Sequence, residues 1–393
     1  MKTFLRLVSR TSLILSMTSM TAAVFGQNYT QVNLVSNVSG VAPVTDPNLI
    51  NPWGLSRRSG SPWWVSDNGT GVSTLYNGAG AVQALVVTIP KADPNNKIFP
   101  TGTPTGTIFN SVPTDFLLPG GFSSIFLFST IDGTISGWNP NVNPTVAVIA
   151  VKTTDGSSYT GLTSAFVNGN RYLYAANFTK GRVDVYDNNF HPVKLGDEYG
   201  HNLFDFGQSP AFTDFFLPRN FVPFNVQTIG NNVVVTYALH LPGQPFETDG
   251  PGLGFVDIYT AKGRLIQRLE HGDWLNAPWG VALAPLDFGR SSHDLLIGQF
   301  SGGGTTEFSG TIAIYDIVTG QFKGLLKDAT GKTLAINGLW AISPANSSGP
   351  GSYDKAGVPG AELYFTAGPN HGTGGLFGYL KPAAADLTEG NDQ

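Results

Sequence analysis

The sequence contains no cysteine and few charged residues, which make up 12% of its 393 residues. Without cysteine, a disulfide-stapled scaffold, thiol catalysis and cysteine-based metal sites are all excluded. Asp and Glu outnumber Lys and Arg by 27 to 22. This acidic balance, with basic residues scattered along the chain, argues against a nucleic-acid partner. No apolar run reaches the ~20 residues that a membrane-spanning helix needs.

Glycine, proline and aromatic residues are abundant instead. The chain has 49 Gly and 26 Pro, while hydrophobic residues reach 41% and aromatic residues 12%. That apolar content is enough for a packed core. Many turn residues together with many aromatics favour an all-β protein over a helical one.

The first 26 residues have the pattern of an export signal. Lys2, Arg6 and Arg10 precede an uncharged, modestly apolar stretch over residues 11–25, and small residues follow. A membrane anchor is the alternative, but the stretch is short and diluted by Ser and Thr. We therefore expect cleavage after Ala23 or Gly26, a domain over residues 27–381 and a polar tail over 382–393. The expected location is secreted or periplasmic, and the expected state is a monomer.

A strand–turn–strand unit returns six times along the chain. Each unit has a β-rich run, a Gly-containing turn and a second run that ends with an aromatic residue five positions after a Gly. A further strand opens each unit. The closing aromatics are Tyr76, Trp138, Tyr186, Tyr259, Tyr315 and Tyr379. Six such units predict a six-bladed β-propeller, because radial repetition leaves only short, protected sheet edges.

The ring must also be closed. Residues 29–35 precede the first unit and alternate in polarity, with Val32 and Leu34 on one face. We expect this segment to be the outer strand of the last blade, which holds residues 338–380.

Several segments resemble one protein family. They are NPWGLS (51–56), PTGTIFN (104–110), DGTISGWNP (132–140), YLYAANFTKGRVDVYD (172–187), LNAPWGVALAP (275–285) and INGLWAI (336–342). Over almost the whole chain, the sequence resembles a family of exported, uncharacterised bacterial six-bladed propellers that is distantly similar to NHL-repeat proteins. The resemblance implies the fold and export but no reaction. Gln299 departs from the family pattern, in which Asn is expected.

Polar residues gather where the inner strands begin and where the second and third strands join, at the mouth of the predicted channel. The predicted ligand-binding residues are Asn51, Asp67, Asn68, Asn177, Asn225, Asn276, Gln299, Asn337, Asn370 and His371. A channel mouth is the usual ligand site of a propeller. Asn is also a common turn residue, so these amides have a structural explanation as well. Trp53, Trp279 and Trp340 are expected to wedge adjacent blades, or else to form ligand platforms.

No catalytic motif is present, and no two of the six His are spaced as zinc ligands on one helix or strand. His240, at the base of the loop over residues 241–252, is the best single candidate for a general base. No cofactor is evident, but Asn, Asp and backbone oxygens at the mouth are suitable donors for calcium.

Two functions remain open. The first is an exported, non-catalytic binding or scaffold protein that holds a glycan, peptide or protein at the channel mouth. The second is a calcium-dependent hydrolase or lyase, similar to the lactonases that also use six-bladed propellers. Convergence of Asp67, Asn177 and Asn276 on one point would favour the second.

Overall fold

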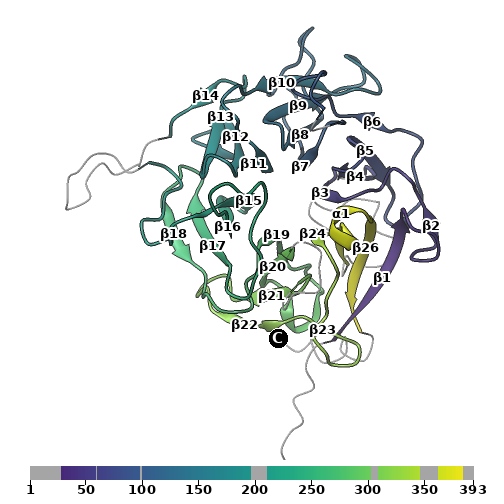
Figure 1. Ribbon diagram of the computed structural model, residues 1–393, viewed down its shortest axis with the longest axis vertical. Helices are drawn as coiled ribbons and strands as arrows, with labels where there is room; N and C mark the ends of the chain where they lie inside the picture. Colours follow the sequence, from purple (N-terminus) through teal and green to yellow (C-terminus); the bar gives the residue numbers. More distant parts are fainter. Residues whose placement is uncertain are drawn as a thin grey trace, which may run out of the picture.

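Six β-sheets are arranged around a central axis (Figure 1). The computed structural model describes residues 28–58, 60–97, 100–195, 210–301, 309–345 and 362–383. The predicted signal peptide and most of the predicted tail lie outside the described residues. No helix among the described residues has the length and apolarity to cross a bilayer.

Five blades are four-stranded antiparallel sheets whose strands run in chain order from the axis outward. Blade 1 is β3 (Pro52–Ser56), β4 (Trp63–Asp67), β5 (Val72–Tyr76) and β6 (Val87–Thr88). Blade 2 is β7 (Pro104–Phe109), β8 (Phe126–Thr130), β9 (Thr134–Trp138) and β10 (Val148–Lys152). Blade 3 is β11 (Tyr159–Val167), β12 (Asn170–Asn177), β13 (Arg182–Tyr186) and β14 (Pro192–Val193). Blade 4 is β15 (Phe221–Ile229), β16 (Asn232–Leu239), β17 (Gly254–Thr260) and β18 (Leu265–Arg268). Blade 5 is β19 (Pro278–Leu283), β20 (Leu295–Gln299), β21 (Ile312–Tyr315) and β22 (Phe322–Leu325).

The sixth blade is closed by the N-terminal strand, as predicted. β24 (Leu339–Pro344), β25 (Leu363–Ala367) and β26 (Leu376–Pro382) are followed outward by β1 (Asn28–Ser36). β1 is antiparallel to β26, with Val32 opposite Tyr379 and Ser36 opposite Leu376. Two short strands, β2 (Val44–Thr45) and β23 (Lys327–Asp328), pair in parallel with its two ends. The six-bladed propeller and its closure are therefore confirmed.

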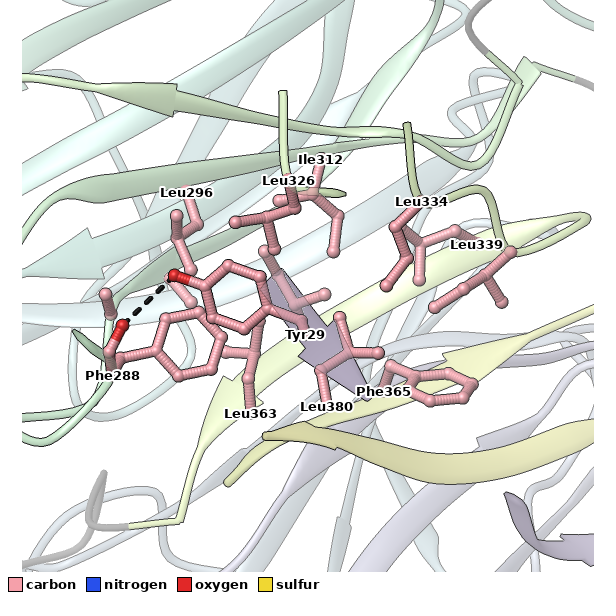
Figure 2. Close-up of a cluster of buried hydrophobic side chains, with 14 of the residues drawn as sticks. Tyr29, Phe288, Leu296, Ile312, Leu326, Leu334, Leu339, Leu363, Phe365 and Leu380 are labelled. Atoms are coloured by element: carbon pink, nitrogen blue, oxygen red, sulfur yellow. Dashed lines mark hydrogen bonds between the residues drawn. The ribbon is translucent and has the colours of Figure 1, made fainter. Parts of the chain in front are cut away.

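β1 also fastens the last blade to the blade before it. Tyr29, at its start, is 1% exposed and packs in a core cluster made by residues of blades 5 and 6 (Figure 2). Its hydroxyl donates a hydrogen bond of 3.0 Å to the carbonyl oxygen of Phe288, on the β19–β20 connection. The closing strand thus contributes packing as well as a ladder of backbone hydrogen bonds.

Glycine is required where the third strand of a blade begins. The backbone at Gly71, Gly133, Gly181 and Gly310 has a positive φ, which L side chains rarely adopt. At Gly310 a Cβ would also overlap the carbonyl oxygen of Ile336, on the connection to the next blade. The repeated glycine therefore marks a tight turn and a close contact with neighbouring backbone.

Truncation of Tyr29 tests the packing at the closure. Tyr29→Ala is expected to lower the free energy of unfolding by about 3–5 kcal/mol, because it removes a large buried ring. Tyr29→Phe keeps the ring and leaves the Phe288 carbonyl unpaired, so a loss of about 1–2 kcal/mol is expected. Urea denaturation followed by tryptophan fluorescence measures both. Equal losses for the two variants would contradict the packing role.

The repeated glycine is tested by Gly310→Ala, with Gly121→Ala as its control. Both glycines have a positive φ, but a Cβ at Gly121 would meet nothing within 4 Å. The control variant should lose about 1–2 kcal/mol from backbone strain alone. Gly310→Ala should lose at least about 2 kcal/mol more, measured by denaturation, because the backbone of a second segment must move.

Candidate functional site

The centre of the ring is filled by aromatic side chains from five blades. Trp53 and Trp340, near the starts of β3 and β24, stack with ring centroids 3.5 Å apart. Trp279, near the start of β19, meets them edge-on at 6.0 and 5.6 Å. Blades 1 and 5 are not neighbours, so the contact of Trp53 with Trp279 passes across the axis. We call this cluster the aromatic plug; it consists of Trp53, Phe178, Phe224, Trp279, Phe300 and Trp340.

The plug explains what Trp53, Trp279 and Trp340 do. Two of their contacts do join neighbouring blades, as wedges would, but the three indoles meet in one cluster. Their exposed fractions are 6% for Trp53, 3% for Trp279 and 1% for Trp340. Because these rings are so buried, they fill the channel and leave little ring surface accessible to a ligand. The plug divides the channel into the mouth, where the inner strands begin, and a rear opening, where they end.

Two of the predicted ligand-binding amides hold this plug in place. The side-chain oxygen of Asn51 accepts a hydrogen bond of 2.9 Å from the indole nitrogen of Trp340. The side-chain nitrogen of Asn225 donates a hydrogen bond of 2.7 Å to the backbone oxygen of Trp279. Asn225 is buried, whereas Asn51 is partly exposed. Both residues therefore have a role inside the protein.

Four further predicted residues, of which Asn68 is only half-buried, brace loops within or beside their own blades. Fully buried Asn276 accepts from the Gly250 amide at 2.8 Å and donates to the Ser301 hydroxyl at 2.8 Å. Gln299 accepts from the Asn276 backbone nitrogen at 3.0 Å. Asn177 donates to Asp184 at 2.6 Å, and Asn68 donates to the Pro104 carbonyl at 3.2 Å.

Asp67 is fully buried in blade 1. One of its carboxyl oxygens accepts from the backbone and the hydroxyl of Thr74, at 3.0 and 2.7 Å. Burial raises its pKa well above the ordinary value, an effect that the nearby Asp46 charge reinforces. Asp67, Asn177 and Asn276 bond groups in or next to their own blades, and the described residues include no group of three or more His, Asp and Glu placed to hold a metal.

At the mouth itself, Asn337, Asn370 and His371 are exposed and lie close together. The Asn337 side chain accepts a hydrogen bond of 3.2 Å from the Asn370 backbone. Asn370 and His371, in the short turn α1 (Pro369–Gly372), both have a φ of 55°. Non-glycine residues in this region are uncommon and often mark functional sites.

A carboxyl group of blade 4, that of Asp249, lies close enough to His371 for the His371 charge to act on it. Glu247 and Asp249 lie in the loop over residues 241–252, which we call the mouth loop. Burial raises the pKa of Glu247 to about 7, and the Asp249 charge adds to the shift. Burial raises the pKa of Asp249 to about 6, although the His371 charge opposes that shift. One Asp249 carboxyl oxygen is buried and makes no hydrogen bond.

The sequence analysis identified the mouth loop, but it did not predict that Asp249 of this loop lies near His371. Asp249 and His371 come from different blades, and no local pattern links them. His240, the predicted general base, instead contacts the Gln244 carbonyl oxygen at 2.8 Å and packs on Phe178, with ring centroids 4.4 Å apart. These contacts fix the base of the mouth loop.

Behind the plug lies a cavity of about 370 Å³, the rear cavity, lined by all six inner strands. Its lining includes Gly54, Gly106, Leu162, Gln227, Trp279 and Ala341. An adjoining hollow of about 610 Å³, the rear rim, continues outward past the ends of β3, β7 and β11. The two hollows share five residues, which are Leu55, Thr107, Gln227, Thr228 and Ser343.

The fold and these openings define a six-bladed β-propeller with a plugged channel. The chain belongs to the family of the uncharacterized protein L690 of Acanthamoeba polyphaga mimivirus, to which it is 30% identical over 353 residues, covering 88% of this chain and 84% of the relative. It is 27% identical over 351 residues to the uncharacterized protein R648 of the same virus, covering 88% of this chain and 78% of that one. No protein-family model matches the chain. Both relatives are viral, so they do not support the bacterial origin expected from the sequence.

Two solved structures are similar to the chain at low sequence identity. A catalytically inactive virginiamycin B lyase from Staphylococcus aureus with quinupristin is 10% identical, with a TM-score of 0.44, over 91% of this chain and 99% of that chain. BBS1N in complex with ARL6DN is 11% identical, with a TM-score of 0.40, over 83% of this chain and 77% of that chain.

The pKa shifts in the mouth loop predict a pH dependence of stability. A carboxyl with a higher pKa when folded binds its proton more tightly in the folded chain. The free energy of unfolding therefore falls as the pH rises from about 4 to about 7. Glu247→Gln with Asp249→Asn should reduce this fall by roughly 1 kcal/mol per group, since both are partly solvated.

Urea denaturation at several pH values between 4 and 8 measures this effect. Burial also raises the pKa of Asp257, in β17, to about 7, so Asp257 likewise makes the free energy of unfolding fall as the pH rises. The double variant therefore keeps part of the pH dependence. An unchanged slope in the double variant would show that the two mouth-loop carboxyls ionise normally.

Proposed function

We propose that the protein is an exported, non-catalytic binding protein that holds a small ligand, or the tip of a glycan or peptide, in the rear cavity of its channel. The rear cavity is the observation that carries this proposal. Its volume, about 370 Å³, falls in the range of small-molecule sites, roughly 300–1,000 Å³. The expected export signal supports a role outside the cell.

The chemistry of the cavity favours binding over catalysis. Its lining combines apolar side chains such as Leu162, Val281 and Ile342 with the amides of Asn225 and Gln227 and the hydroxyls of Thr107, Thr228 and Ser343. No ionisable side chain is among the described residues that line it. A general acid or base must lie within hydrogen-bond reach of the reacting atoms. These residues supply shape and hydrogen bonds instead.

Binding at the rear differs from the mouth site expected from the sequence. At the mouth, Asn51 and Asn276 already use their side chains in hydrogen bonds that hold the plug and the mouth loop. A ligand there would compete with those internal hydrogen bonds. At the rear, the inner strands leave an open concave surface.

A second candidate function is supported at the mouth. Glu247 and Asp249, with pKa values raised to about 7 and about 6, and the neighbouring His371 are groups suited to moving protons near neutral pH. This arrangement would suit a hydrolase or lyase, the alternative favoured by analogy with lactonases. A calcium ion there would need oxygen ligands beyond these carboxyls.

Blocking each opening in turn separates the two functions. Gln227→Trp fills the rear cavity from β15, and Asn337→Trp is the matched control at the mouth. Purified wild-type protein and both variants are tested by thermal shift and calorimetry against mono- and oligosaccharides and short peptides, and for turnover of lactones and esters. The proposal expects a ligand that Gln227→Trp weakens at least about tenfold, equivalent to roughly 1.4 kcal/mol, and that Asn337→Trp leaves unchanged.

Three outcomes would overturn the proposal of a binding site in the rear cavity. Binding that only Asn337→Trp abolishes would place the site at the mouth. Turnover of a lactone or ester that is lost in Asp249→Asn would favour the enzyme. Absence of any binding sensitive to Gln227→Trp would reject the rear cavity as a site.

A further inference from the structure

We propose that the rear opening selects ligands bearing an anionic group, a carboxylate or a phosphate, which Arg57, Arg58 and Thr107 receive where the rear rim meets the rear cavity. This inference rests on the proposed binding function and deepens it. The rim and the cavity are continuous through Thr107, Gln227 and Ser343. A ligand can therefore place its charge at the rim and its body in the cavity.

The charge of this opening differs from that of the whole chain. Among the described residues that line the rim and the cavity, the ionisable side chains are Arg57 and Arg58, and no carboxyl group is present. The chain as a whole carries a net charge of −5. Positive charge in a concave, poorly solvated region focuses the local potential and attracts anions.

Arg57 is held in position by its surroundings. It is 5% exposed, and its guanidinium carbon lies 4.7 Å from the ring centre of Trp63. Such a cation–π contact fixes the planar group and lowers the entropy that it loses on binding. Arg58 follows on the surface, where its backbone nitrogen donates to the Ser61 hydroxyl at 3.1 Å. A buried and an exposed guanidinium thus lie side by side in the chain.

Thr107 gives a second and independent indication of a ligand. It is 6% exposed, and its hydroxyl oxygen is buried without a hydrogen-bond partner. Buried polar groups are nearly always hydrogen-bonded, so an unpaired one needs an explanation. Nearby Thr163 and Thr228 differ, because their hydroxyls bond each other at 3.0 Å and the Thr228 hydroxyl also bonds the Ser164 carbonyl.

Arg171 is excluded from this role by its contacts. Its guanidinium donates to the Asn110 side chain at 2.5 Å and to the Ser164 hydroxyl at 2.8 and 3.1 Å. These bonds hold the edge of the rim, since Ser164 lines it. Arg171 is therefore a structural residue.

Matched sugars test the inference directly. Glucuronate and glucose 6-phosphate each carry one anionic group that glucose lacks, and inorganic phosphate supplies the anion alone. Calorimetry at low and high salt should show binding of the charged probes at least about tenfold tighter than binding of glucose, with the difference reduced by salt. Preference for glucuronate identifies a carboxylate site, and preference for the two phosphates identifies a phosphate site.

Two variants connect the binding to the named residues. Arg58→Gln should weaken the charged probes about fivefold or more, whereas Arg219→Gln, an exposed arginine before β15, should have no effect. Thr107→Val should also weaken binding, yet it should keep or raise the unfolding midpoint, because a methyl group replaces an unpaired hydroxyl. A lowered midpoint would show that the hydroxyl serves the fold instead.

The possible failures are distinguishable. If a neutral sugar or peptide binds in a manner sensitive to Gln227→Trp but insensitive to Arg58→Gln and salt, the anion inference is wrong and the binding function stands. If no probe binds in a manner sensitive to Gln227→Trp, the binding function fails as well.

Discussion

Everything in this propeller depends on how its centre is filled. Six sheets that converge on one axis leave a gap that their backbones cannot close, and stacked Trp53 and Trp340 with edge-on Trp279 close it. Close packing of large rings sets the spacing of blades 1, 5 and 6. The hydrogen bonds from Asn51 and Asn225 then fix the plug relative to the surrounding strands. Each of these two asparagines thus holds a tryptophan of the neighbouring blade.

The plug also gives the molecule two chemically different ends. The mouth carries Glu247, Asp249 and His371 on loops, where burial raises the pKa of Glu247 to about 7 and that of Asp249 to about 6. The rear opening is lined by inner strands and carries Arg57, Arg58 and hydroxyl groups. Proton transfer is suited to the first and recognition of an anion to the second. Because aromatic rings separate them, substitutions at one end should not alter the other directly.

The fold was predictable because its signal is repeated. Tyr76, Tyr186, Tyr259 and Tyr315 close equivalent strands, and alternation over residues 29–35 identified the closing strand. The site was less predictable. Asn177 ends β12 and Asn276 precedes β19, as expected, but the sequence does not say whether an amide faces solvent or braces a loop. The proximity of Asp249 to His371 and the unpaired hydroxyl of Thr107 depend on how separate blades meet, which no local pattern contains.

The closing strand has a consequence for the order of folding. Ser36 and Gly375 are hydrogen-bonded although 339 residues separate them, and Tyr29 reaches Phe288 across 259. Among the strands of the propeller, β1 is made first and its partner β26 last, so the ring cannot seal until its final strand has been made. Contacts this distant in sequence slow folding and leave a strand edge unpaired meanwhile. A chain shortened at either end would lose the same blade.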